Sequence, residues 1–426
     1  MKAKERDQDY IASLTRELVP ALGCTEPIAL AYVAAKARAV LGDFPDRVEL
    51  LCSGNIIKNV KGVAVPNAGG LRGVEIAAVL GVIGGNESRA LEVLEEITPD
   101  HVEQAKELLR REFFSYSLAE GVANLYISVK VFKGKHSAQV SVVNHHTYIT
   151  EIYRDGKAVF RQDPEQQGQE SNWNLWSVRE ILDFAERTDL APVRELLARQ
   201  IAMNTAISQE GLEKPYGAQI GRTLLGCYGD RDVKLRAQAK TAAGSDARMG
   251  GCTLPVVINS GSGNQGLTVS LPVIEYAKER KAPEEQLYRA LLLSNLLSIY
   301  QKHYIGSLSA FCGAVTAACG SGAAITYLSG GDYDAICRTI TNTLANVGGI
   351  LCDGAKGSCA AKIASAVDAA ILAHHMSMAG QVFQPGEGIV AGSPEQTIRN
   401  VGHIGRVGMR ETDLETLRLM MGQLSA

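Results

Sequence analysis

The sequence predicts an α+β fold, with a mainly helical body and a smaller α/β portion that contains an antiparallel sheet. Two patterns support this class. Apolar and polar residues alternate over much of residues 114–160, as in strands, whereas segments beyond about residue 176 have the three- and four-residue apolar spacing of helices. At 426 residues, the chain is long enough for two domains and a large buried core.

The first elements are expected to be two helices and a strand. Helical apolar spacing extends over residues 4–18. A second helix should cover about residues 26–41, because Thr25 is a good N-cap and Pro27 suits a first helical turn. The alternating residues 47–52 predict a strand.

Cys24 lies just before the second predicted helix. Because the positive end of a helix dipole favours a thiolate, we expect the pKa of this thiol to be lowered. The alternative is that Cys24 is a small packed residue in a turn. The N-cap signal at Thr25 favours a functional role.

A polar, glycine-bearing loop is expected at residues 53–62, directly after the strand. Loops in this position commonly carry ligand contacts. Asn55, Lys58 and Asn59 could bind a small carboxylate, although ordinary turn chemistry explains Asn and Gly equally well.

The predicted sheet is an antiparallel meander of three segments, 124–132, 138–143 and 148–153. His145 and His146 lie between two of these strands and are conceivable ligands. Adjacent strand positions point to opposite faces, so a loop is the favoured interpretation of this pair.

Residues 161–172 contain no aliphatic residue and predict a mobile loop or linker. Helices are expected before the sheet at about 71–83 and 99–112, and after it at about 176–187, 192–209, 215–226, 283–303, 308–328, 332–347, 358–379 and 394–423.

Composition excludes several classes of partner. The 43 basic and 46 acidic residues give a formal net charge of -3, which lacks the basic character of proteins that bind nucleic acid or anionic membranes. No basic segment followed by an apolar one opens the chain, and no apolar run reaches transmembrane length, so the expected protein is soluble and cytoplasmic. Its nine cysteines are then expected to be reduced thiols, available for metal binding or catalysis.

Three of these cysteines, Cys312, Cys352 and Cys359, each lie beside glycine, alanine or serine, so a bulky inorganic group could approach the backbone. Their spacing of 40 and then 7 residues matches neither zinc modules nor ferredoxins, and predicts a site that the fold assembles. Three ligands would leave one metal position open to substrate. The alternative is that they are buried small apolar residues.

Residues 241–266 form the other unusual stretch. Gly261, Gly263 and Gly266 satisfy the GxGxxG pattern of dinucleotide sites, but Pro272 interrupts the segment that would have to be a helix. A nicotinamide oxidoreductase is therefore a weak alternative.

An anion cradle is the better interpretation of the glycine motif. Its backbone N–H groups would bind a carboxylate, and Ser260, Ser262, Asn264 and Gln265 would add side-chain donors. A free amino acid would suit such a pocket.

Three further polar residues have open or structural interpretations. Asp246 is expected to be structural, and Arg248 either pairs with it or binds a carboxylate in bidentate fashion. His303 follows an apolar helix, where a core or rim histidine is favoured over a proton carrier.

Five separated motifs occur in order along the chain, at residues 22–27, 53–59, 245–251, 260–266 and 352–354. With these motifs, the chain resembles the iron-sulfur L-cysteine desulfidase family, which is related to the alpha chain of iron-sulfur L-serine dehydratases. The resemblance extends over nearly the whole sequence.

The resemblance implies an oxygen-sensitive 4Fe-4S cluster, no pyridoxal phosphate, and conversion of L-cysteine to pyruvate, ammonia and sulfide. Carried over by motif, Cys312, Cys352 and Cys359 are implied as cluster ligands. Cys24 is implied as an alternative third ligand, or as a thiol or thiolate that acts on the substrate.

Roles for other residues follow from the same resemblance. Cys24 is the first candidate for the base that removes the α proton, ahead of Lys58 and His303. The side chains expected to orient the substrate's carboxylate and amine are Ser53, Asn55, Asn59, Ser260, Ser262 and Asn264.

The rival activity is L-serine dehydration by the same machinery, and the alternative of another class is a noncatalytic metal- or thiol-binding protein. The expected partner is a small amino acid, in a chain that could be a homo-oligomer. Three domains are expected: N-terminal helices with Cys24 that pack on the C-terminal body (1–42), an α+β domain with the meander (43–165) and a helical iron-sulfur domain (173–426).

Overall fold

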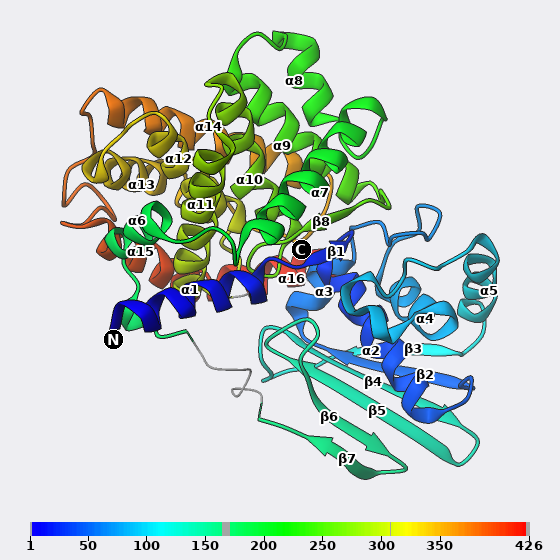
Figure 1. Ribbon diagram of the computed structural model, residues 1–426. Coiled ribbons are helices and arrows are strands. Elements are labelled where there is room, and N and C mark those ends of the chain that lie inside the picture. Colours follow the sequence, from blue (N-terminus) through cyan, green and yellow to red (C-terminus); the bar gives the residue numbers. More distant parts are fainter. Residues whose placement is uncertain (1, 164–170, 307, 423–426) are drawn as a thin grey trace.

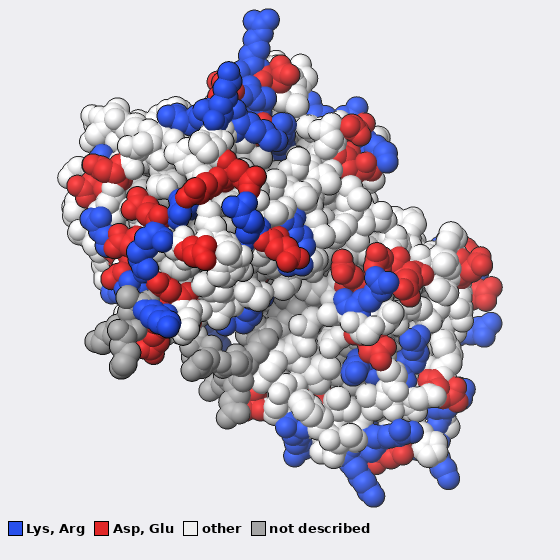
Figure 2. Space-filling model, viewed as in Figure 1, with Lys and Arg blue, Asp and Glu red and all other residues white. Residues whose placement is uncertain are grey.

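Two groups of elements, a sheet with its covering helices and a larger set of helices, lie side by side in the computed structural model (Figure 1). The structure describes residues 2–163, 171–306 and 308–422. The expected fold class, mainly helical α+β, is confirmed. Over the described ranges, no helix is both long and apolar enough to cross a membrane. Basic and acidic side chains are intermixed on the face shown in Figure 2.

The first group contains a six-stranded sheet of order β3-β2-β4-β5-β6-β7. Its strands are β2 (Arg47–Cys52), β3 (Phe114–Leu118), β4 (Tyr126–Lys133), β5 (His136–Val143), β6 (Ile149–Arg154) and β7 (Lys157–Arg161). The meander β4 to β7 is antiparallel as predicted, but β2 and β3 pair in parallel. A parallel pair requires a long crossover connection, which strand periodicity does not reveal.

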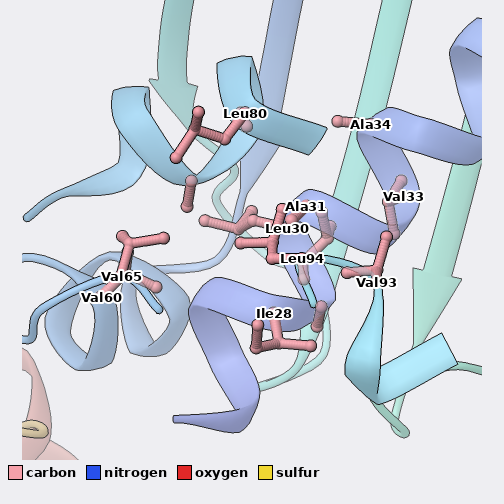
Figure 3. Close-up of a cluster of buried hydrophobic side chains, with 14 of the residues drawn as sticks. Ile28, Leu30, Ala31, Val33, Ala34, Val60, Val65, Leu80, Val93 and Leu94 are labelled. Carbon is pink, nitrogen blue, oxygen red and sulfur yellow. The ribbon is translucent and has the colours of Figure 1, made fainter. Parts of the chain in front are cut away.

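Helices between residues 25 and 109 surround this sheet, and two of them, α2 and α4, contact its strands. The helices are α2 (Thr25–Leu41), α3 (Gly54–Val60), α4 (Val74–Gly84), the 3-10 helix η1 (Glu87–Glu92) and α5 (Pro99–Leu109). Figure 3 shows Leu30 and Ala31 of α2 packed with Leu80 of α4 and with Val93 and Leu94. The small side chains of α2 allow this close packing.

The second group is a body of helices. Its elements are η2 (Trp173–Leu175), α6 (Val178–Arg187), α7 (Arg194–Glu213), α8 (Ile220–Tyr228), α9 (Val233–Met249), α10 (Gly263–Glu279), α11 (Glu284–Ile305), α12 (Gly313–Leu328), α13 (Tyr333–Val347), α14 (Ser358–Met378), α15 (Pro394–His403), the π-helical turn η3 (Ile404–Gly408) and α16 (Arg410–Met421).

Helix α12 packs against α10, α11, α13 and α14. Its small residues permit this, since a Cβ on Gly320 would lie 2.5 Å from the Ser294 carbonyl oxygen of α11.

Three local predictions were wrong. The expected loop at residues 53–62 contains α3, and α9 was not predicted. Helix α10 was also missed, because Pro272 lies inside it. The core residues Leu271 and Val273 hold this turn in place, so packing outweighs the hydrogen bond that proline cannot donate.

The chain ends connect the two groups. Helix α1 (Lys2–Glu17) places Tyr10 and Leu14 in the core of the helical body, and β1 (Pro20–Leu22) pairs with β8 (Pro255–Val257). Helix α16 returns to contact α3. The predicted N-terminal unit thus contributes α1 to one core and α2 to the other, and the three-domain division stays a prediction. The middle of the predicted linker, residues 164–170, lies outside the described residues.

Candidate active site

Two cysteine-bearing segments of the helical body run side by side. The backbone N–H of Cys312 donates to the carbonyl of Ile350 at 3.0 Å, and that of Cys352 donates to the carbonyl of Ala310 at 2.6 Å. Cys312 caps the start of α12, and Cys359 lies in the first turn of α14. Folding therefore brings together thiols that are separated in sequence by α12 and α13.

All three of these cysteines, with Cys24, line one cavity. It encloses about 790 Å³ of empty space, including the part that opens to solvent. Cys24 packs in the same small cluster as Cys359, and its thiol donates to the Met249 sulfur at 3.7 Å. The cavity wall also contains Glu26, Asn59, His146, Arg248, Ser260, Ser262, Asn264, Gln265 and Lys302.

The donor set at this cavity has the chemistry of an iron-sulfur site, because such clusters are held by cysteine thiolates. Within the described residues, no group of three or more His, Cys, Asp or Glu side chains is arranged to hold a metal ion. Thiols around a cluster are separated by the inorganic core, whereas the ligands of a single ion share one centre. Cys312, Cys352 and Cys359, gathered around a cavity, fit the former.

Gly354 lets the Cys352 loop pack directly on α3. Its φ of +93° is in the left-handed region, and a Cβ there would lie 2.3 Å from the Lys58 carbonyl oxygen. The motif at residues 352–354 is thus explained by close approach of two backbones.

Cys24 does not have the lowered pKa that its position predicted. It is itself the N-cap residue of α2, which begins one residue earlier than expected. Burial raises the pKa of its thiol to about 12, and the nearby Arg248 guanidinium, which lowers it, does not compensate. Desolvation of the thiolate raises this pKa by more than the helix N-terminus lowers it, so Cys24 is a protonated thiol at neutral pH.

The glycine motif forms the first turn of α10 instead of an open loop. The Ser262 hydroxyl caps this helix by accepting from the Gln265 N–H at 3.5 Å. The Ser260 hydroxyl donates to the Asn259 side chain. Ser260, Ser262 and Asn264 all line the cavity, as does Asn59 of α3.

Arg248 is fixed at the end of α9. It donates from Nη1 to Asn264 Oδ1 at 2.5 Å and from Nη2 to the Gly23 carbonyl at 2.6 Å. It forms no ion pair with Asp246, whose carboxylate instead accepts from the Gly221 N–H at the start of α8. Burial raises the pKa of Asp246 to about 6, although the backbone N–H groups of α8 lower it. Asp246 is thus structural, as expected.

Ser53, Asn55 and Lys58 lie at a different cavity, between α3, residues 118–124 and α16. The Ser53 hydroxyl donates to the Asn124 carbonyl at 2.7 Å, and Asn55 donates to Asp413 at 2.8 Å. Lys58 pairs with Asp413 and reaches the Cys352 carbonyl oxygen at 3.4 Å. Of these three residues, Lys58 alone contacts the loop that carries Cys352.

His303 lies at a third cavity, which adjoins the first. Its ring stacks on Trp173 with centroids 3.9 Å apart. Burial, with a smaller contribution from Arg406, lowers the pKa of His303 to about 4. The two cavities share Lys302, His146, Ser260 and Gly261.

The sequence patterns gave no role to Glu26 and Lys302 of the cavity wall, and for His146, a conceivable ligand, they favoured a loop. Lys302 is buried on α11 and forms no side-chain hydrogen bond or ion pair in the described part of the chain. Burial lowers its pKa, although the nearby Cys352 and Cys312 raise it. The signal was available, because the helical spacing of α11 places this lysine on a buried face.

Comparison with known proteins shows that the chain is similar to one described family. The model of the family described as serine dehydratase alpha chain matches residues 88–418. A UPF0597 protein of Lachnoclostridium phytofermentans is 52% identical over 96% of this chain and 98% of the relative. One from Desulfitobacterium hafniense is 50% identical over 98% of each, and one from Treponema denticola is 44% identical over 98% and 99%. The family match includes Cys312, Cys352 and Cys359 and excludes Cys24.

Proposed function

The chain belongs to the serine dehydratase alpha chain family, and from this membership we propose that it is a lyase of the serine dehydratase type that acts on L-cysteine. The reaction would convert L-cysteine and water to pyruvate, ammonia and hydrogen sulfide without pyridoxal phosphate. The observation that carries the proposal is the convergence of Cys312, Cys352, Cys359 and Cys24 on one cavity.

Cys312, Cys352 and Cys359 would hold a 4Fe-4S cluster. A bound cluster with an open iron would supply a Lewis acid for the substrate. Cys24 is left as a free thiol, which suits the burial that keeps it protonated.

The elimination also requires a group that accepts the α proton. Lys302 Nζ is the best placed, since it lines the cysteine cavity and its lowered pKa favours the neutral amine. Cys24, as a protonated thiol, can donate a proton from Sγ. Lys58 and His303 line other cavities and are not assigned this step.

The decisive experiment compares pyruvate release from L-cysteine and L-serine, by protein prepared and reconstituted without oxygen. We expect faster release from L-cysteine, together with bound iron, acid-labile sulfide and the visible absorption of a cluster. A strong preference for L-serine would overturn the substrate assignment, and iron uptake without pyruvate release would favour a noncatalytic metal-binding protein.

A matched pair of variants tests the ligands. Cys312→Ser should lose most of its iron, whereas Cys227→Ser, which alters an exposed cysteine of α8, should retain it. Equal iron content in the two variants would exclude Cys312 as a ligand.

L-Serine dehydration is the second candidate, and the family description favours it. The two substrates differ in one atom, the sulfur or oxygen that leaves the β carbon.

A further inference from the structure

Three side chains in the wall of the cysteine cavity have buried polar atoms that no described residue satisfies. These atoms are Arg248 Nε, a hydrogen-bond donor, Gln265 Oε1, an acceptor, and the ring nitrogen Nε2 of His146. Buried polar atoms without partners are rare in native proteins because their desolvation is costly. A donor and an acceptor left open at one cavity indicate a ligand that brings both kinds of group.

Arg248 carries a positive charge that lacks a partner. Its side chain is 2% exposed, and it forms no ion pair with any described residue. Its guanidinium lies against Gly263, where a Cβ would be 2.5 Å from Cζ and Nε. With Asn264 and Gly23 fixing its two Nη atoms, the group is rigidly placed for an anion.

Gln265 lies beside the first cysteine segment. Its carboxamide packs on Gly313, where a Cβ would be 2.6 Å from Cδ. Glu26, whose carboxylate lines the same cavity, adds a negative charge. These oxygens can accept hydrogen bonds from an ammonium group.

Arg248 and Gln265 meet at the first turn of α10, because Arg248 packs on Gly263 and bonds Asn264, the two residues before Gln265. The N-terminus of this 17-residue helix adds a favourable field for an anion. The open donor and the open acceptor therefore both lie at the start of α10, in the wall of one cavity.

We propose that Arg248 and Gln265 select a free α-amino acid, with the Arg248 guanidinium binding the α-carboxylate and Gln265 Oε1, with Glu26, receiving the α-ammonium. This assignment rests on the proposed function, because it concerns the ligand of the same cavity. Both charged groups of an α-amino acid sit on one carbon, which matches a donor from the end of α9 and an acceptor from the first turn of α10 in the wall of one cavity. An internal residue of a peptide has neither charge and would leave Arg248 unpaired.

Three small probes separate the two contacts. L-Alanine has both charged groups but no leaving group, isopropylamine lacks the carboxylate, and propionate lacks the ammonium. Calorimetric titration of the anaerobically reconstituted protein should show that L-alanine binds more tightly than either fragment. No detectable preference for L-alanine would overturn the proposal.

Variants assign each contact. Arg248→Lys should weaken L-alanine binding by about tenfold or more and remove its advantage over isopropylamine. Gln265→Met should instead remove the advantage of L-alanine over propionate. A variant that folds, as judged by circular dichroism, and binds all three probes like the parent contradicts the role of that residue.

Gly263→Ala provides a test that keeps every charge. The added methyl group would displace the guanidinium, so L-alanine should again bind less tightly. Gly226→Ala is the matched control, because a Cβ on this helical glycine of α8 meets nothing within 4 Å. If Arg248→Lys fails to fold, Gly263→Ala decides the question, and unchanged L-alanine binding in it contradicts the proposal.

The binding experiment and the test of the proposed reaction can fail independently, because L-alanine has no group that can leave in an elimination. Suppose that the protein releases pyruvate from L-cysteine, but that Arg248→Lys and Gly263→Ala bind L-alanine as tightly as the parent. This result would refute only the role proposed for Arg248 and Gln265. The expected binding pattern without pyruvate from either substrate would refute only the proposed reaction.

Discussion

The Cys24 thiol is held in its protonated form by its surroundings. It is buried between Met249 and the Cys359 region, and removal of its proton would leave a charge out of contact with water. Arg248 is close enough to lower the pKa, but burial dominates. A protonated thiol can donate a proton in the reaction, and it is a poor nucleophile.

Alkylation measures this state. At pH 8, iodoacetamide should modify the exposed Cys227 at least about tenfold faster than Cys24, because the thiolate is the reactive form. Cys319, whose pKa burial also raises to about 12, should react as slowly as Cys24. Peptide mass spectrometry of protein treated without oxygen gives the rates. Rapid modification of Cys24 would mean that the helix terminus prevails over burial.

Lys302 is expected to determine the pH dependence of turnover. Burial lowers its pKa from the ordinary 10.5, so the amine loses its proton at lower pH than an exposed lysine does. If the neutral amine accepts the α proton, kcat/KM for L-cysteine should rise with pH until that proton is lost.

Lys302→Met should slow pyruvate release by about 100-fold or more and abolish this rise with pH. Lys135→Met, in the exposed turn after β4, is the control and should leave both unchanged. A Lys302→Met enzyme with the parent's pH profile would exclude this residue as the base.

At the residue scale, sequence patterns indicated the thiols of the cavity but not Lys302. Small neighbours marked Cys312, Cys352 and Cys359, and these do converge on one cavity. Lys302 was not singled out, although its helical spacing indicated a buried face, and His146 was named only as a conceivable ligand in a loop; the burial of both depends on the whole fold.

At the scale of elements, α16 supports the cysteine loop through α3. Lys58 is 1% exposed, pairs with Asp413 of α16 and reaches the Cys352 carbonyl. A lysine so deeply buried depends on its carboxylate partner, because an unpaired buried charge is strongly destabilising.

Asp413→Asn should therefore lower the free energy of unfolding by about 3 kcal/mol in urea titrations. The double variant Lys58→Met/Asp413→Asn should recover part of that loss, since no buried charge remains. Glu415→Gln removes an exposed partner of Arg418 on the same helix and should change stability by less than about 1 kcal/mol. Equal effects of Asp413→Asn and Glu415→Gln would contradict the coupling.

Sequence patterns located most elements but failed where packing overrides local preference. Helical apolar spacing predicted α1, the cap signals of Thr25 and Pro27 predicted α2, and alternating residues predicted the meander. It missed α3, where Ile56, Ile57 and Val60 are held by the core in a segment that reads as a loop. Helix α10 was missed because Pro272 was given more weight than its buried neighbours.

At the scale of the molecule, the cavity lies where the two groups of elements meet. Glu26 and Asn59 come from the sheet group, whereas Arg248, Lys302 and the three cysteines come from the helical body. The periodicity of a sequence predicts elements but not which of their faces will meet, so the first group's share of the wall required the structure. The five motifs could only indicate that residues 22–27 and 53–59 contribute.

The pairing of segments 310–312 and 350–352 also bears on how the protein matures. The thiols of these segments come close together only after α12 and α13 have packed. A polypeptide that is still being synthesised therefore has no assembled site for a cluster. Under the proposed function, insertion of the cluster would therefore follow the folding of the helical body, and a folded, metal-free protein would be the form that receives it.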